Sequence, residues 1–163
     1  FKPGQANIDL LMERVTKKGG PHPRMVVMAD VEDANGEVTG DQSAEVNDEI
    51  RRARAWLGDK RVIGYWNPVS NGELWRTRPT GLRLVTPSYG REPGSPKIKP
   101  EGYFAHQYTD NGPCPPFGRC DANFADMTVA ELEAMLGLVR SPAPEPVVAG
   151  VAVNGVAVPA PQL

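Results

Sequence analysis

The sequence predicts an α/β fold whose sheet is barrel-like and made mostly of parallel strands. Two observations lead to this prediction. Amphipathic helical segments alternate with short apolar runs rich in β-branched residues, the order expected of strands joined by crossover helices. The 163 residues hold only four such runs, whereas a closed barrel needs about eight strands. We therefore expect this chain to supply roughly the second half of the barrel.

The first two helices are predicted from apolar residues at helical spacing. Residues 5–18 place Ile8, Leu11 and Val15 on one stripe, and two glycines and a proline follow. A second helix begins near residues 39–41 and ends at residue 56 or 57, with charges opposite its apolar stripe. We expect these charges to form a solvated face. They are Glu45, Asp48, Glu49, Arg51, Arg52 and Arg54.

Four strands and a last helix complete the predicted elements. The first strand is a nearly continuous apolar run, too short for a typical helix, as in a strand buried on both faces. The final helix opens at Thr128 with a capping box, because Glu131 follows three residues later. The four strands are residues 25–32, 61–66, 82–86 and 103–108.

Composition narrows the possible functions. The net charge of −2 argues against a nucleic-acid partner, which normally needs a basic face. No apolar run approaches the roughly 20 residues of a membrane span, and no signal peptide is visible. Cys114 and Cys120 alone cannot make a zinc site, and neither His22 nor His106 stands at ligand spacing, so we expect no metal or other cofactor. The two cysteines could close a short disulfide loop or remain independent thiols.

The composition changes near the C-terminal end. From Ser141 onward the residues are mostly Pro, Ala, Val and Gly, as in a semi-rigid linker. We predict a domain over residues 1–138 and a linker or tail over residues 139–163. Because the chain begins at Phe1 instead of Met, we expect a processed or partial product.

Two acids close the first predicted strand. Asp30 and Glu32 are two residues apart, so they share one side of the sheet, with Cα atoms roughly 6.5–7 Å apart. They stand at the C-terminal end of a buried strand, where barrel enzymes place catalytic groups. Neighbouring carboxyls of like charge raise one pKa, which suits glycoside cleavage by one acid and one carboxylate. A solvated acidic turn is the alternative.

Further candidates follow later strands. Asp121 comes after the fourth strand and its loop, which would bring it to the same rim; a solvated loop aspartate or helix cap is the alternative. Aromatic residues near strand ends would suit stacking on sugar rings, although such residues also fill cores. They are Tyr65, Trp66, Trp75, Tyr89, Tyr103 and Tyr108.

The order of these motifs resembles glycoside hydrolase family 25, the lysozymes or muramidases. The motifs are Asp-Val-Glu at residue 30, Gly-Tyr-Trp-Asn-Pro at 64, Leu-Val-Thr-Pro-Ser-Tyr-Gly at 84, His-Gln-Tyr-Thr-Asp at 106 and Asp-Ala-Asn at 121. The resemblance covers residues 1–138 and is closest to actinobacteriophage lysin domains. It implies the C-terminal portion of an irregular, TIM-like β/α barrel. It also implies cleavage, with retention and no metal, of the β-1,4 bond between N-acetylmuramic acid and N-acetylglucosamine in peptidoglycan.

The resemblance also implies roles for single residues. Glu32 matches the general acid/base, Asp30 the partner carboxylate that orients the acetamido group or stabilises charge, and Asp121 the acid of the closing Asp-x-Asn motif. The residues implied to bind substrate or brace the groove are Tyr65, Tyr89, Gln107 and Tyr108. Three features depart from the pattern. The opening strand with a further aspartate has no counterpart here, and Val85 and His106 stand where the family usually has tryptophan.

Three functions fit these observations. The first is a peptidoglycan hydrolase acting on glycan strands at the bacterial cell wall, outside the cytoplasm. A phage would deliver it as an endolysin or virion component, and an N-terminal segment or another chain would complete the barrel. The second is a non-catalytic wall-binding or structural module of a phage particle, suggested by the missing strands. The third is a chitinase-like barrel glycosidase that shares the Asp-x-Glu motif.

Overall fold

The computed structural model describes residues 3–4, 6–33 and 36–138. The predicted linker or tail over residues 139–163 lies outside the described residues. The elements in chain order are α1 (Asn7–Thr16), β1 (Val27–Val31), α2 (Ser43–Leu57), a 3-10 turn η1 (Asp59–Arg61), β2 (Val62–Trp66), β3 (Arg83–Pro87), β4 (Tyr103–Cys114), β5 (Gly118–Phe124) and α3 (Val129–Met135).

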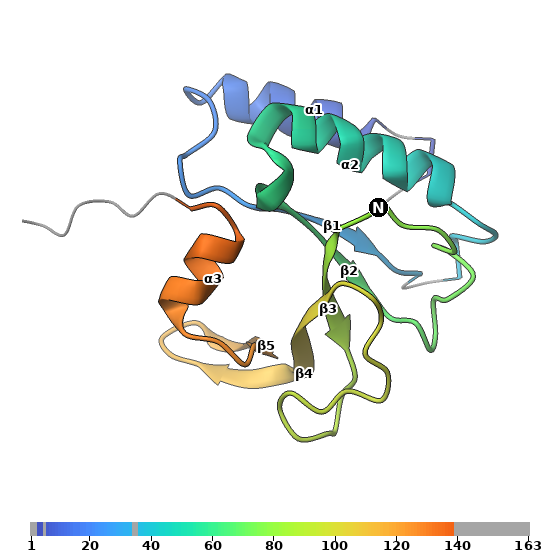
Figure 1. Ribbon diagram of the computed structural model, residues 1–163, viewed down its shortest axis with the longest axis vertical. Coiled ribbons are helices and arrows are strands. Elements are labelled where there is room, and N and C mark those ends of the chain that lie inside the picture. The colour runs from blue at the N-terminus through green and yellow to red at the C-terminus, as the bar shows by residue number, and fades with distance from the viewer. Residues whose placement is uncertain (1–2, 5, 34–35, 139–163) are drawn as a thin grey trace, which may run out of the picture.

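The strands form one sheet in the order β1-β2-β3-β4-β5. Strands β1 to β4 pair in parallel, and β5 returns antiparallel to β4. The sheet curls into a half-barrel, with the helices on both sides of it (Figure 1). The predicted mixed α/β class and the mostly parallel sheet are thus confirmed.

The fifth strand was not predicted, and the expectation of four strands is wrong. β4 continues to Cys114, six residues past the predicted end, and then turns back into β5. Five of the seven β5 residues are exposed, so no apolar alternation marks the strand in the sequence. Its pairing with β4 defines it instead. Cys114 and Cys120 lie near the tip of this hairpin and are free thiols.

The α1 and α2 helices lie side by side across the outer face of the sheet (Figure 1). Their apolar stripes pack with one set of strand residues in the main core, because side chains alternate along each strand. This core holds Ile8, Val31, Val46, Ile50, Ala53, Val62, Trp66, Leu74, Trp75, Leu82 and Leu84.

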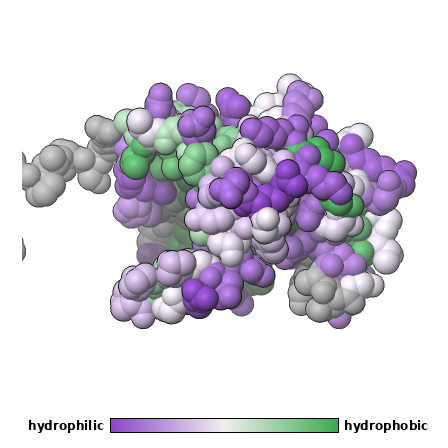
Figure 2. Space-filling view, turned by 90° about the horizontal axis from the view of Figure 1, so that it is seen from below, coloured by the Kyte–Doolittle hydropathy of each residue, from purple (hydrophilic) through white to green (hydrophobic). Residues whose placement is uncertain are grey.

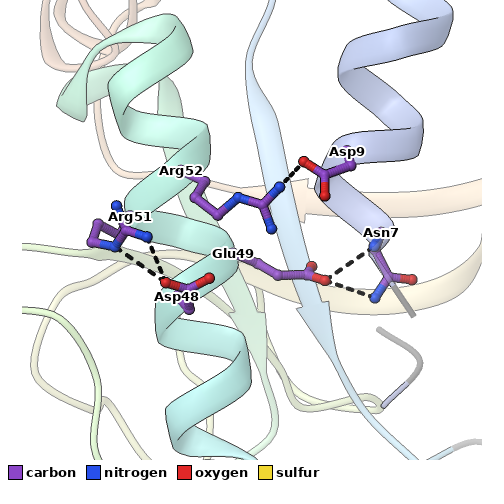
Figure 3. Close-up of polar contacts among 6 residues, drawn as sticks. All are labelled: Asn7, Asp9, Asp48, Glu49, Arg51 and Arg52. Carbon is purple, nitrogen blue, oxygen red and sulfur yellow. Dashed lines mark hydrogen bonds and ion pairs between the residues drawn. The ribbon is translucent and has the colours of Figure 1, made fainter. Parts of the chain in front are cut away.

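Part of the charged face of α2 contacts α1 (Figure 3). Glu49 accepts hydrogen bonds from the backbone N–H of Asn7 at 3.1 Å and from its side-chain amide at 3.0 Å. Arg52 forms an ion pair with Asp9. The prediction of a wholly solvated face is therefore wrong at Glu49 and Arg52. When two amphipathic helices pack side by side, the polar residues that flank their apolar stripes meet across the groove.

The α3 helix packs on the opposite, concave face. Leu132, Met135 and Leu136 contact the inward-facing strand residues, which include Ile63, Val85 and Ala105. The predicted capping box is confirmed: Thr128 Oγ1 accepts from the backbone N–H of Glu131 at 3.2 Å, and Glu131 Oε2 accepts from the backbone N–H of Thr128 at 2.7 Å.

Two connections between parallel strands hold no α-helix. Residues 67–82 join β2 to β3, and residues 88–102 join β3 to β4. The first connection inserts Trp75 into the core, where its indole N–H donates to Asn47 Oδ1 at 2.8 Å. Gly64 lies beneath this ring, because a Cβ at that position would approach the ring to 2.9 Å. Loops thus take the places that helices fill in a regular β/α barrel.

β1 stands at one edge of the sheet and pairs only with β2 among the described residues. A mostly apolar cavity adjoins this edge and is lined by residues of β1, α1, α2 and β2, including Met28, Leu11 and Ile50. Elsewhere, the surface seen from below is mainly hydrophilic, with hydrophobic residues in separate small patches (Figure 2). Within the described ranges, no helix is both long and apolar enough to cross a membrane.

Candidate active site

The two acids of the first strand reach the concave side at its C-terminal edge. Val31 is buried on the helix side, so Asp30, its neighbour in the strand, points to the other side. Asp30 pairs in register with Tyr65 of β2, which is packed on the concave face. Glu32 follows the last residue of β1 and is exposed. The strand end therefore presents a partly buried carboxyl beside an exposed one.

Both carboxyls are electrostatically perturbed. Burial raises the pKa of Asp30, and the negative charge of Asp121 raises it further. Burial also raises the pKa of Glu32, followed by the charges of Asp30 and then Asp121. One negative charge beside a second carboxyl favours the protonated form of the latter. Glu32 therefore keeps its proton to a higher pH than an ordinary glutamic acid.

Asp121 comes from an element that the sequence did not predict. It was expected just beyond the fourth strand and its loop, and it lies within β5. The β4–β5 hairpin folds this strand back along the sheet, and this brings Asp121 within electrostatic range of Asp30 and Glu32. The structure thus gathers the three predicted acids, one of them from a different kind of element than expected.

A hydrogen-bonded group of two tyrosines and a glutamine adjoins the acids. Gln107 Oε1 on β4 accepts from the hydroxyls of Tyr65 and Tyr89, each at 2.7 Å. Burial, the neighbouring Tyr89 hydroxyl and the charges of Glu32 and Asp30 raise the pKa of Tyr65. The last two causes show that the Tyr65 hydroxyl lies near the carboxyls. Since two hydroxyls occupy the Gln107 carbonyl, its NH₂ group is the part left to donate to a ligand.

The other aromatic candidates lie elsewhere. Tyr108 packs edge-on to His106, with ring centroids 6.2 Å apart. The hydrogen-bonded tyrosines, in contrast, contact Gln107. Trp66 and Trp75 are core residues, and the ring of Trp66 carries the Arg78 guanidinium at 4.0 Å. Tyr103 lies under the ammonium group of Lys99 at 5.2 Å. Of the predicted substrate-binding residues, Tyr65, Tyr89 and Gln107 come together.

The geometry suits acid/base chemistry on an organic substrate. Among the described residues, no group of three or more His, Cys, Asp and Glu side chains could hold a metal ion. Sequence reasoning missed His106 as a site-supporting residue. It was predicted to be a polar groove residue or a packed strand histidine in place of an expected tryptophan, and it is buried. Its contacts depend on a loop conformation that carries no signal in the sequence.

Replacing Asp30 with Asn is expected to stabilise the fold near neutral pH. The pKa of Asp30 is raised in the folded state, so the folded chain binds more protons than the unfolded chain between the ordinary and the raised pKa. The free energy of unfolding of the natural chain therefore falls as pH rises through that window. We expect the Asn variant to melt on the order of 2 °C higher at pH 7. At about pH 3, below the ordinary pKa, the difference should vanish.

Thermal denaturation followed by circular dichroism at both pH values checks this result. Asp110→Asn, at an exposed position of β4, is the matched control. A variant Asp30→Asn that melts below the natural chain at pH 7 would show that the Asp30 carboxylate is stabilising, contrary to its raised pKa.

No family model matches this chain, but comparison with known proteins finds similar chains. The chain is 37% identical over 149 residues to the uncharacterized protein Rv3766 of Mycobacterium tuberculosis, covering 85% of this chain and 52% of that protein. It therefore spans about half the length of this relative. Among solved structures, the spore cortex lytic enzyme SleM of Clostridium perfringens is similar at 19% identity and a TM-score of 0.45, over 76% of this chain and 43% of SleM. Both proteins extend well beyond the part that this chain matches.

Proposed function

We propose that this chain carries the acid/base centre of a retaining muramidase, which cleaves the β-1,4 bond between N-acetylmuramic acid and N-acetylglucosamine in peptidoglycan. One observation carries the proposal: Glu32 is an exposed carboxyl with a raised pKa at the C-terminal edge of a half-barrel, beside Asp30 and within range of Asp121. The motif order that resembles family 25 lysozymes adds the substrate and the stereochemistry.

The arrangement supports a specific division of labour. Glu32 donates its proton to the glycosidic oxygen as the bond to the anomeric carbon breaks, and it later takes a proton from the attacking water. Asp30 orients the acetamido group of the substrate or stabilises the positive charge that develops on the sugar ring. Asp121 adds to the negative potential that keeps Glu32 protonated. A retained anomeric configuration follows if both bond changes occur on one face of the ring.

The tyrosine group fits the wall of a glycan groove. Tyr89 is 48% exposed, so its ring is available for stacking while its hydroxyl is held by Gln107. Tyr65 is almost fully buried, donates to Gln107, and lies close enough to the acids for their charges to raise its pKa. We assign Tyr89 to sugar contact and Tyr65 to bracing.

We further propose that an N-terminal segment or another chain completes an irregular TIM-like barrel along β1. The support is physical: the edge of β1 adjoins an apolar cavity lined in part by residues of the strand, and unpaired strand edges are normally covered in barrels. A phage would deliver the complete protein to the bacterial wall, outside the cytoplasm, as the resemblance to phage lysin domains implies.

Digestion of purified peptidoglycan tests the proposal. Released fragments are reduced with borohydride and identified by mass spectrometry, and proton NMR of the fresh product gives the anomeric configuration. We expect new reducing ends on N-acetylmuramic acid, formed first as the β-anomer. New reducing ends on N-acetylglucosamine would contradict the proposed bond. Equal release from chitin would favour a chitinase-like glycosidase.

A wall-binding module without activity is the second candidate. The half-barrel with an open β1 edge favours it, because a catalytic groove with one side missing holds its substrate poorly. Sedimentation of the chain with insoluble peptidoglycan, without release of reducing ends even from the complete protein, would select this function over hydrolysis.

A further inference from the structure

The connection between β3 and β4 places Tyr89 without the help of a helix. Residues 88–102 contain three prolines and hold no regular element. Irregular loops are usually the more mobile parts of a fold. A loop residue that contacts substrate therefore needs something to fix its backbone.

One buried imidazole binds this loop at two points. His106 on β4 is 0% exposed. Its Nδ1 accepts the backbone N–H of Gly94 at 3.1 Å, and its Nε2 lies 2.9 Å from the carbonyl oxygen of Ser88. Since the Gly94 N–H can only donate, Nδ1 must accept, and the neutral ring then carries its proton on Nε2 and donates it to Ser88. A neutral histidine supplies one acceptor and one donor, which a tryptophan cannot do.

The bond to Ser88 acts directly on Tyr89. The Ser88 carbonyl belongs to the peptide bond that leads into Tyr89, so the Nε2 bond fixes the plane of that peptide. Gln107, the next residue after His106, accepts the Tyr89 hydroxyl on the other side of β4 and also accepts the Ser88 N–H through its backbone carbonyl at 3.0 Å. Adjacent residues of one strand thus hold both ends of Tyr89.

The far end of the segment is also confined. A Cβ at Gly94 would lie 2.7 Å from the Phe124 ring of β5, so this ring packs closely on Gly94. The Tyr103 hydroxyl donates to the Gly94 carbonyl at a long 3.5 Å. His106 therefore makes polar contacts with both ends of the segment 88–94, at Ser88 and at Gly94.

We propose that His106 is a positioning residue for the glycan site: its imidazole clamps residues 88–94 at both ends and thereby sets Tyr89 against Gln107. The assignment of Tyr89 to sugar contact rests on the proposed function. The clamp itself does not, because it is a property of the free chain. Two experiments therefore separate the clamp from the enzyme activity.

The first experiment measures the clamp by amide hydrogen exchange at Gly94. His106→Phe keeps a ring of similar size without either nitrogen, and we expect Gly94 exchange to accelerate at least tenfold. His106→Asn offers an acceptor near the Nδ1 position and should restore part of the protection. Tyr103→Phe is the control and should leave the rate within about twofold of the natural chain. Unchanged Gly94 protection in the Phe variant would overturn the clamp.

The second experiment measures the position of Tyr89. With 3-fluorotyrosine at residue 89, the fluorine resonance of His106→Phe should move towards that of the free amino acid, whereas Tyr103→Phe should not move it. A resonance unchanged in the Phe variant, despite faster exchange at Gly94, would show that the clamp does not position Tyr89. This readout needs no substrate, so it decides the proposal even if the chain cleaves no glycan.

Kinetics on peptidoglycan fragments then test the consequence for the site. In His106→Phe we expect KM to rise on the order of tenfold and kcat to change less than about threefold, because groove contact is lost and Glu32 is untouched. Partial unfolding would instead lower kcat at constant KM. A fall in kcat alone would thus assign His106 a merely structural role. Absence of hydrolysis in the natural chain would reject the proposed function and leave the first two measurements standing.

Discussion

Glu32→Gln is expected to abolish peptidoglycan hydrolysis, lowering kcat by 10²-fold to 10⁴-fold, the usual contribution of a general acid/base. Gln keeps the shape of the side chain but has no proton to donate. Release of reducing ends from purified walls measures the loss. Because the pKa of Glu32 is raised, the proposed hydrolysis by the natural chain should decline as pH rises through that raised value, at a higher pH than for an ordinary glutamic acid.

Two controls make this result specific. Glu13→Gln changes an exposed acid on α1 whose ion pair is with Lys17, and it should leave the rate unaltered. The Glu32→Gln variant should also melt no lower than the natural chain, since it removes a carboxyl whose pKa is raised by folding. Hydrolysis that persists at the natural rate in Glu32→Gln would remove Glu32 from the mechanism.

Trp75→Ala is expected to have the largest effect on stability, about 3–5 kcal/mol. The side chain is fully buried between the sheet and α2 and fills the space above Gly64. Its removal leaves a cavity and takes the indole donor from Asn47. Since domains of this size unfold with about 5–15 kcal/mol, this single change removes a large fraction of the total. Urea denaturation followed by circular dichroism measures it.

Trp75→Phe separates packing from hydrogen bonding at this site. The smaller ring still fills much of the space, so we expect a loss nearer 1–2 kcal/mol, comprising the hydrogen bond and some volume. Val69→Ala, at a residue that is 53% exposed in the same connection, should change stability by less than about 0.5 kcal/mol. A cost for Trp75→Ala as small as that of Val69→Ala would contradict the packing described above.

The fold could be predicted wherever burial leaves a pattern in the sequence. α2 buries one side, so its apolar residues recur at the helical period, and the Thr128 capping box is a local signal. The expectation that the first strand is buried on both faces is wrong, because β1 is an edge strand and its Met28 is 45% exposed. β5 buries few side chains, so it forms through its pairing with β4. The sequence of β5 alone does not reveal this pairing. The contact between Glu49 and Asn7 was missed for the same reason. Both features arise from neighbours distant in the sequence.

The site could be predicted in part. Asp30 lies in β1 and Glu32 directly follows its last residue, so their spacing in the sequence was enough to predict them as neighbours at this strand end. Asp121 was suggested by the order of motifs, although the hairpin that brings it near the pair was not foreseen. The clamp by His106 could not be predicted, because it depends on backbone groups of a proline-rich loop, and every residue has such groups. The positions of backbone donors and acceptors in the folded chain therefore cannot be deduced from the residue types.

The edge of β1 also bears on how the chain behaves at high concentration. Its five residues, Val-Met-Ala-Asp-Val, include no lysine or proline of the kind that commonly discourages strand addition at exposed edges. One of the five, Met28, is 45% exposed. Two copies of the chain can therefore meet edge to edge and cover the very strand that carries Asp30. Specific activity should then fall as protein concentration rises, and dilution or a short competing strand peptide should restore it.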